Sequence, residues 1–136
     1  MSDLDRASQM EFILDHYQNP RNHGELPDAD ASVQGGLPGC SDVITIYLKV
    51  EDDKITDIRF TGEGCTISQA SASALTEEVK GMPISAVDQL DHGVMSDLLG
   101  EEVVRVRPRC ATLSLDTLRA AVYEYRKNRL QAGKGQ

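Results

Sequence analysis

The residues of this chain best suited to chemistry are three cysteines, at positions 40, 65 and 110. An odd number of cysteines does not make a closed set of disulfides. The acidic N-terminal stretch MSDLDRASQMEF has no apolar segment of the kind that a secretory signal needs. We therefore expect a cytoplasmic protein with reduced thiols, in which cysteines indicate metal binding or catalysis before disulfides.

Each cysteine lies at an expected junction between elements of secondary structure. Cys40 follows GLPG and precedes a strand, Cys65 lies between a strand and a helix, and Cys110 lies between an extended segment and a helix. The partial positive charge of a helix N-terminus favours a thiolate over a thiol, which both a metal ligand and a sulfur nucleophile require. Gly62 and Gly64 remove side-chain bulk beside Cys65.

Asp42 is the expected fourth member of the group. It lies two residues after Cys40, so the period of two in a strand turns both side chains to the same side. Three thiolates and one carboxylate make the four ligands of a tetrahedral Zn²⁺ site, with a charge of about −2. Arg109 and Arg107 are placed to offset that charge. The spacing matches no short zinc motif, so buried, inert cysteines, a structural zinc, a labile metal and a cluster all stay open.

The remaining sequence predicts the elements that position this group. An amphipathic helix is expected over residues 9–18, where Met10, Ile13, Leu14 and Tyr17 form an apolar stripe and His16 is partly solvated. A short strand near 31–36 precedes an antiparallel hairpin of strands 42–50 and 55–62, joined by the four-residue loop EDDK. A helix then starts at Thr66, capped by a Thr66–Gln69 box, with an apolar and small-residue face.

The C-terminal half is expected to be mostly helical. Residues 84–100 predict one or two short helices, 103–108 (VVRVRP) an extended segment, and 112–130 a final helix. Helices that follow a hairpin favour an α+β fold, in which helices cover one face of a small antiparallel sheet of about three strands. The length favours a single domain over 1–136.

Charge and hydropathy exclude two classes of partner. The net charge of −8 argues against nucleic acid, although RVRPR and YRKNR give a local basic patch. No stretch of apolar residues is long enough to span a membrane.

Four segments resemble the U-type iron–sulfur cluster scaffold family, which contains NifU N-terminal domains, IscU and SufU. They are DHYQNPRNHG, GCSDVITIYLKV, ITDIRFTGEGCTISQASASALTE and RPRCATLSLDTLRAAV, in the family's order and across residues 9–126. The resemblance implies a small α+β fold of the SufE/NifU type. It implies a scaffold that accepts sulfur from a PLP-dependent cysteine desulfurase of the IscS or SufS kind. Such a scaffold assembles a transient [2Fe–2S] cluster from iron and passes it to apo iron–sulfur proteins.

By the same resemblance, iron, the cluster or zinc would be held by Cys40, Asp42, Cys65 and Cys110. The chain departs from the family at Ser41, which is usually glycine, and at Arg109, where the IscU branch has histidine. VVRVR also replaces the chaperone motif of that branch. Yet the interval from Cys65 to Cys110 is too short for the insertion of the SufU branch.

These departures leave three functions open. The first is a cluster scaffold that is not an enzyme. The second is a zinc-dependent sulfurtransferase, in which the resemblance makes Cys40 the persulfide acceptor and Arg109 stabilises negative charge. The third is a structural zinc domain.

Overall fold

The computed structural model describes residues 3–36 and 42–134, so Cys40 and Ser41 lie outside the described residues. Within this part the chain forms six helices and three strands. In order, they are α1 Asp3–Gln18, β1 Ala31–Gly36, β2 Val43–Glu51, β3 Lys54–Glu63, α2 Thr66–Val79, α3 Ile84–Val87, α4 Gly93–Leu99, α5 Glu101–Val106 and α6 Pro108–Lys134. This segregation of strands and helices confirms the predicted α+β class.

The strands form an antiparallel sheet in the order β1-β2-β3. β2 alternates as the period of two predicts, with Ile44, Ile46, Leu48 and Val50 buried and the residues between them half-buried. The predicted hairpin is confirmed, but its four-residue loop is wrong. The strands continue to Glu51 and from Lys54, and the two residues left between them, Asp52 and Asp53, have φ of 51° and 60°. Positive φ at both positions is the conformation that a two-residue hairpin turn of type I′ requires.

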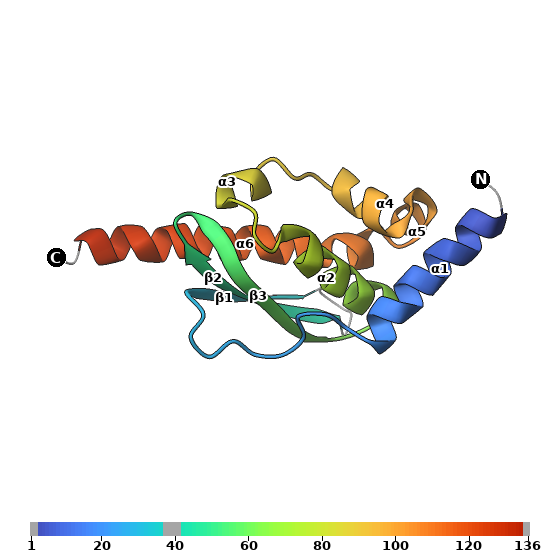
Figure 1. The fold of residues 1–136 in the computed structure, drawn as a ribbon, viewed down its shortest axis with the longest axis horizontal. Helices are drawn as coiled ribbons and strands as arrows, with labels where there is room; N and C mark the ends of the chain where they lie inside the picture. The colour runs from blue at the N-terminus through green and yellow to red at the C-terminus, as the bar shows by residue number, and fades with distance from the viewer. Residues whose placement is uncertain (1–2, 37–41, 135–136) are drawn as a thin grey trace.

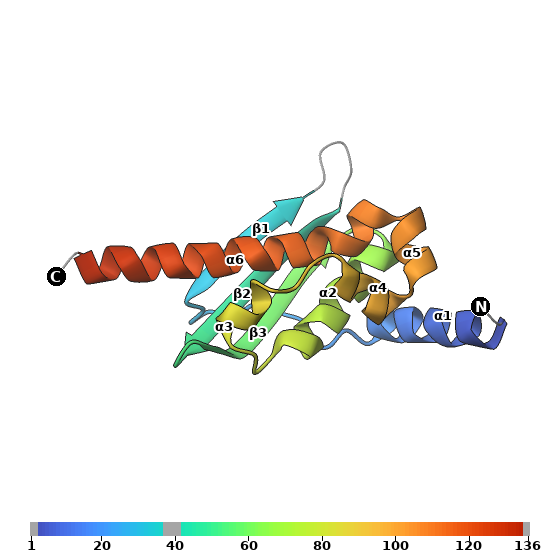
Figure 2. The same ribbon diagram turned by 90° about the horizontal axis from the view of Figure 1, so that it is seen from above.

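Two helices cover one face of this sheet. α6 packs against β1 and β2, while α2 packs against β3 and against α6. In two perpendicular views α6 runs along the sheet and projects beyond it at the C-terminal end (Figures 1 and 2). α2 can lie close because its face is made of small residues, and every residue from Ala70 to Thr76 is buried. The prediction of helices on one face of a three-stranded sheet is therefore confirmed.

α1 packs against α2 at the opposite end of the molecule from the C-terminus (Figure 1). It begins at Asp3, six residues before the predicted start, since the sequence analysis placed the start at residue 9. The predicted apolar stripe is mostly wrong, because Met10, Leu14 and Tyr17 are 43–49% exposed and only Ile13 is buried. His16, expected to be partly solvated, is buried in their place.

The segment 103–108 was predicted to be extended, and this is also wrong. Residues up to Val106 form α5, where Val103 and Val104 pack against the core, and α6 already begins at Pro108. One or two short helices were predicted over 84–100, and the structure has two, α3 and α4. None of the described helices is long and apolar enough to cross a membrane.

Candidate metal centre

Asp42 and Cys65 are brought together by the register of the β2–β3 hairpin. Val43 pairs with Glu63, so the residue before β2 and the junction between β3 and α2 lie side by side. The buried Asp42 carboxylate accepts a hydrogen bond from the backbone N–H of Cys65 through Oδ1, at 2.9 Å. Its other oxygen, Oδ2, lies 3.6 Å from Cys65 Sγ. The hairpin thus holds the carboxylate with one oxygen on the backbone and the other toward the thiol.

Cys110 reaches the same carboxylate from the first turn of α6. Its Sγ lies 3.2 Å from Asp42 Oδ2, and a ligand atom of each of Asp42, Cys65 and Cys110 lies within 4.8 Å of the other two. The helix contributes because the start of α6 lies at the same end of the sheet as the start of α2, against which it packs. The structure therefore brings together three of the four residues expected from the sequence. The fourth, Cys40, lies outside the described residues.

The pKa of the Cys110 thiol is raised to about 12. Burial is the main cause, and the hydrogen bond to Asp42 and the proximity of Cys65 add to it. Desolvation and the neighbouring carboxylate therefore act against the thiolate that the helix N-terminus favours. A bound cation would reverse this balance, since its charge stabilises thiolates.

Glycine at position 64 is required by the Asp42 carboxylate. Gly64 has a φ of +145°, and a Cβ at this position would overlap Asp42 Oδ1 and crowd its Cα. Gly62 is also confined, because a Cβ there would overlap the carbonyl oxygen of Val43. From the sequence, these glycines were expected to remove side-chain bulk beside Cys65. The structure shows that Gly64 makes room for Asp42.

The N-terminus of α2 differs from the predicted capping box. Cys65 occupies the cap position, its side chain accepts no backbone N–H of the first turn, and Thr66 is already helical. The hydroxyl of Ser68 instead donates to the carbonyl of Cys65 at 3.1 Å. The Gln69 amide nitrogen is buried and has no hydrogen-bond partner in the described part of the chain.

The two arginines expected to offset the charge of the site, Arg107 and Arg109, are exposed. Among the described residues, neither side chain makes a hydrogen bond or an ion pair. Arg109 adjoins Cys110 in sequence, and no contact ties its guanidinium to the three ligand atoms.

A buried polar network surrounds His16 and was not predicted from the sequence. Its Nδ1 lies 2.7 Å from Ser73 Oγ, which also accepts the backbone N–H of Arg21 at 2.9 Å. Its Nε2 lies 3.5 Å from Glu77. Burial is the main cause that lowers the pKa of His16, and the charge of Arg21 adds to it. The network joins α1 to α2, and the QASAS run of α2 was the only sign of it in the sequence.

Comparison with known proteins identifies the family of this chain. Residues 8–132 match the NifU-like N terminal domain. The chain belongs to this family. Iron-sulfur cluster assembly scaffold protein IscU 1 of Archaeoglobus fulgidus is 39% identical over 117 residues, which cover 85% of this chain and 76% of the relative.

A second relative carries a different function in its name. Zinc-dependent sulfurtransferase SufU of Bacillus subtilis is 36% identical over 129 residues, covering 82% of this chain and 87% of that protein. The crystal structure of an N-terminal NifU-like protein from Brucella abortus matches with a TM-score of 0.75 and 21% identity, over 86% of this chain and 93% of that one. This likeness supports the fold. The relatives thus include scaffold proteins and a sulfurtransferase.

Proposed function

We propose that this protein is a scaffold for iron–sulfur cluster assembly. It receives sulfur from a PLP-dependent cysteine desulfurase, holds iron and a transient [2Fe–2S] cluster as cargo, and passes the cluster to apo iron–sulfur proteins. The observation that carries the proposal is the convergence of Asp42, Cys65 and Cys110, whose ligand atoms lie within 4.8 Å of one another. Membership of the NifU-like family supports it.

The proposed ligand set is Cys40, Asp42, Cys65 and Cys110, as expected from the sequence. A carboxylate is a harder ligand than a thiolate and holds soft metal centres less tightly. A mixed set therefore suits a protein that must give its cargo away. We further propose that residues 1–136 work as a single domain in the cytoplasm.

A zinc-dependent sulfurtransferase is the second candidate, and the spacing of the ligand atoms fits a zinc ion. Two ligands on one tetrahedral ion, bound at about 2.0–2.3 Å, lie roughly 3.3–3.8 Å apart. The oxygen–sulfur distances of 3.6 Å and 3.2 Å are close to that range. Zinc held there would keep the thiols deprotonated.

In this second function Cys40 is the proposed acceptor. Its thiolate attacks the outer sulfur of the desulfurase persulfide, the S–S bond breaks, and the desulfurase leaves as a thiolate while Cys40 carries the persulfide. Arg109, in the first turn of α6, is the proposed group that stabilises negative charge during the transfer.

The deciding experiment is anaerobic reconstitution with ferrous iron, cysteine, the desulfurase and an added electron donor that reduces the persulfide sulfur to sulfide, followed by visible absorption and by transfer to an apo-ferredoxin. A cluster that forms and transfers supports the scaffold. Retained zinc with a persulfide on Cys40 and no cluster contradicts the scaffold and supports the sulfurtransferase. Undiminished stimulation of the desulfurase by Cys40→Ala would contradict the sulfurtransferase.

A matched control tests whether cluster assembly depends on the position of the cysteines or only on their number. Cys65→Ser removes one proposed ligand, and adding Ser85→Cys at an exposed position restores the number of cysteines. We expect the double variant to assemble no more cluster than Cys65→Ser alone. Recovery of assembly by the added thiol would show that the geometry of the group is unimportant.

A further inference from the structure

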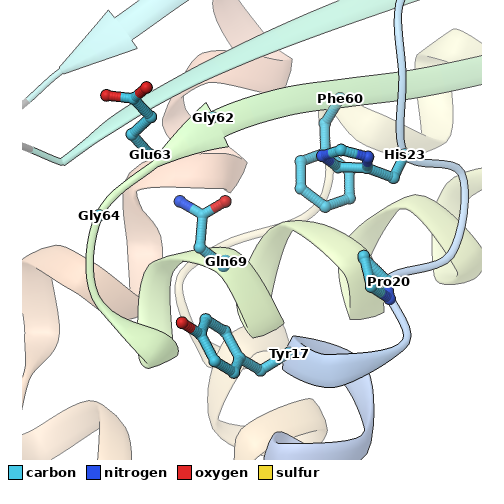
Figure 3. A pocket seen from close by; sticks show the side chains of 8 residues that line it. All are labelled: Tyr17, Pro20, His23, Phe60, Gly62, Glu63, Gly64 and Gln69. Atoms are coloured by element: carbon cyan, nitrogen blue, oxygen red, sulfur yellow. The ribbon is translucent and has the colours of Figure 1, made fainter.

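A cavity of about 410 Å³ lies directly beside the candidate metal centre. It opens between the end of β3, the first turns of α2 and the C-terminal end of α1, and Figure 3 shows the Gln69 amide in its middle, facing the β3 residues. The residues of its wall that matter here are Tyr17, Gly62, Glu63 and Gln69. None of these belongs to the proposed ligand set.

One wall of the cavity is the free edge of the sheet. β3 is an edge strand, and the chain itself pairs with part of that edge. The Phe60 N–H donates to the Asn22 carbonyl at 3.0 Å, and the Gly24 N–H donates to the Phe60 carbonyl at 2.8 Å. Since main-chain groups alternate along a strand, Gly62 also turns its N–H and C=O away from β2. Within the described residues no hydrogen bond joins these two groups to a segment outside the sheet, so the pairing ends at Phe60, which lines the cavity together with His23.

The side chains of the cavity add two more groups without partners. The Gln69 amide nitrogen is buried and forms no hydrogen bond with any described residue, and an unsatisfied buried donor is costly. The exposed Glu63 carboxylate forms no ion pair with the described residues, and no lysine or arginine lines the cavity. The partly exposed ring of Tyr17 supplies an apolar surface on the α1 side.

We propose that this cavity binds an extended, basic segment of a partner polypeptide, which adds one residue of strand to β3 at Gly62. A peptide unit offers the acceptor and donor that the Gly62 N–H and C=O require, and further carbonyls that the Gln69 amide can reach by rotating its end group. A lysine or arginine in the segment faces Glu63, in a protein whose net charge is −8.

The position of the cavity gives this binding a consequence for the metal centre. The wall residues Gly62, Glu63 and Gly64 lead directly into Cys65, and Gly64 packs against the Asp42 carboxylate. A segment bound at Gly62 therefore holds the partner beside the candidate ligands. The inference goes beyond the proposed function and does not depend on it, since the cavity is present whatever the centre carries.

The test uses two-dimensional NMR of the isotope-labelled chain, titrated with the peptide acetyl-Ala-Val-Lys-Val-Ala-amide at millimolar concentrations. We expect saturable shifts of the Gly62 backbone amide and of the Gln69 side-chain amide. A peptide with methylated central nitrogens cannot donate to the Gly62 carbonyl and should bind at least tenfold more weakly. Absence of saturable shifts at Gly62 and Gln69 overturns the proposal. So does equal binding of the methylated peptide, or shifts confined to the exposed α1 residues.

The charge requirement has its own matched pair of variants. Glu63→Gln should weaken binding about two- to fivefold, the range of an exposed ion pair. Glu51→Gln, at the equally exposed end of the neighbouring strand β2, should leave the affinity unchanged. Replacing lysine by glutamate in the peptide should weaken binding to the wild type by a similar factor. Equal affinities of the two variants would remove the basic residue from the proposal.

Discussion

Gly64→Ala should destabilise the metal-free protein more than a comparable glycine replacement, because it displaces the Asp42 carboxylate. The matched control is Gly24→Ala. Gly24 has a φ of +129°, close to the +145° of Gly64, but a Cβ at position 24 would meet no atom within 4 Å. Each replacement forces a backbone conformation that L-residues disfavour, at about 1–3 kcal/mol.

Gly64→Ala has a second effect that Gly24→Ala lacks. The new Cβ would push away the Oδ1 atom of Asp42, which accepts the backbone N–H of Cys65. Leaving that donor without its acceptor costs about 1–3 kcal/mol. We therefore expect a total loss of about 2–6 kcal/mol for Gly64→Ala, against about 1–3 kcal/mol for Gly24→Ala.

Two assays separate these effects. Urea unfolding of the metal-free variants gives the free energies, provided that the slopes match that of the wild type. Competition with a chromogenic chelator gives the zinc affinity, which we expect to fall about 10–100-fold in Gly64→Ala only, as when a group that orients a ligand is lost. Equal losses of stability in both variants, together with unchanged zinc affinity, would refute the role assigned to Gly64.

Three further predictions concern the packing around the site. Burial lowers the pKa of His16 below its ordinary 6.5, so the wild type should lose stability as pH falls below 6.5, and His16→Gln should lose less in urea unfolding at each pH. Ser73→Ala removes a buried hydrogen-bonding group and should cost about 1–3 kcal/mol by thermal unfolding, whereas the exposed Ser85→Ala should change stability by less than about 0.5 kcal/mol. Gly35→Ala would drive a Cβ into the Thr117 hydroxyl and separate β1 from α6, at about 1–3 kcal/mol in the same assay.

The strands were predictable because β-branched residues with a period of two leave few alternatives. The turn between β2 and β3 was not, since Asp52 and Asp53 read as part of a loop and their left-handed conformation depends on how far the strands pair. The helix α5 was missed for a related reason. Val103 and Val104 favour an extended chain by themselves, but packing against the core outweighs that preference.

The buried face of α1 shows a different limit of pattern analysis. The spacing of apolar residues in a helix predicts which side chains could be buried. In α1 only Ile13 of the predicted stripe is buried. The neighbouring position is filled by His16, whose burial depends on a hydroxyl supplied by Ser73 from another helix. A hydrogen-bond partner that lies far away in sequence leaves no trace in local periodicity.

The residue types alone led us to expect that these three candidate ligands lie close together. The structural cause of their proximity is the register of the β2–β3 hairpin. Asp42 could face Cys65 only once Val43 was paired with Glu63, and no local pattern fixes that pairing. The helix N-terminus beside Cys110 was visible in the sequence, whereas the burial and the neighbouring carboxylate that raise the pKa of its thiol were not.

The two oxygens of Asp42 have separate tasks, and this separation links the fold to the proposed chemistry. Oδ1 accepts the Cys65 N–H, which fixes the carboxylate against the start of α2. Oδ2 faces both Cys65 Sγ and Cys110 Sγ and is the oxygen that would bind a metal in the proposed centre. Because the backbone already orients the carboxylate, little ordering remains when a metal binds, and a single oxygen can be released without disturbing the hairpin. A centre of this kind would release a bound metal or cluster while the surrounding backbone keeps its structure.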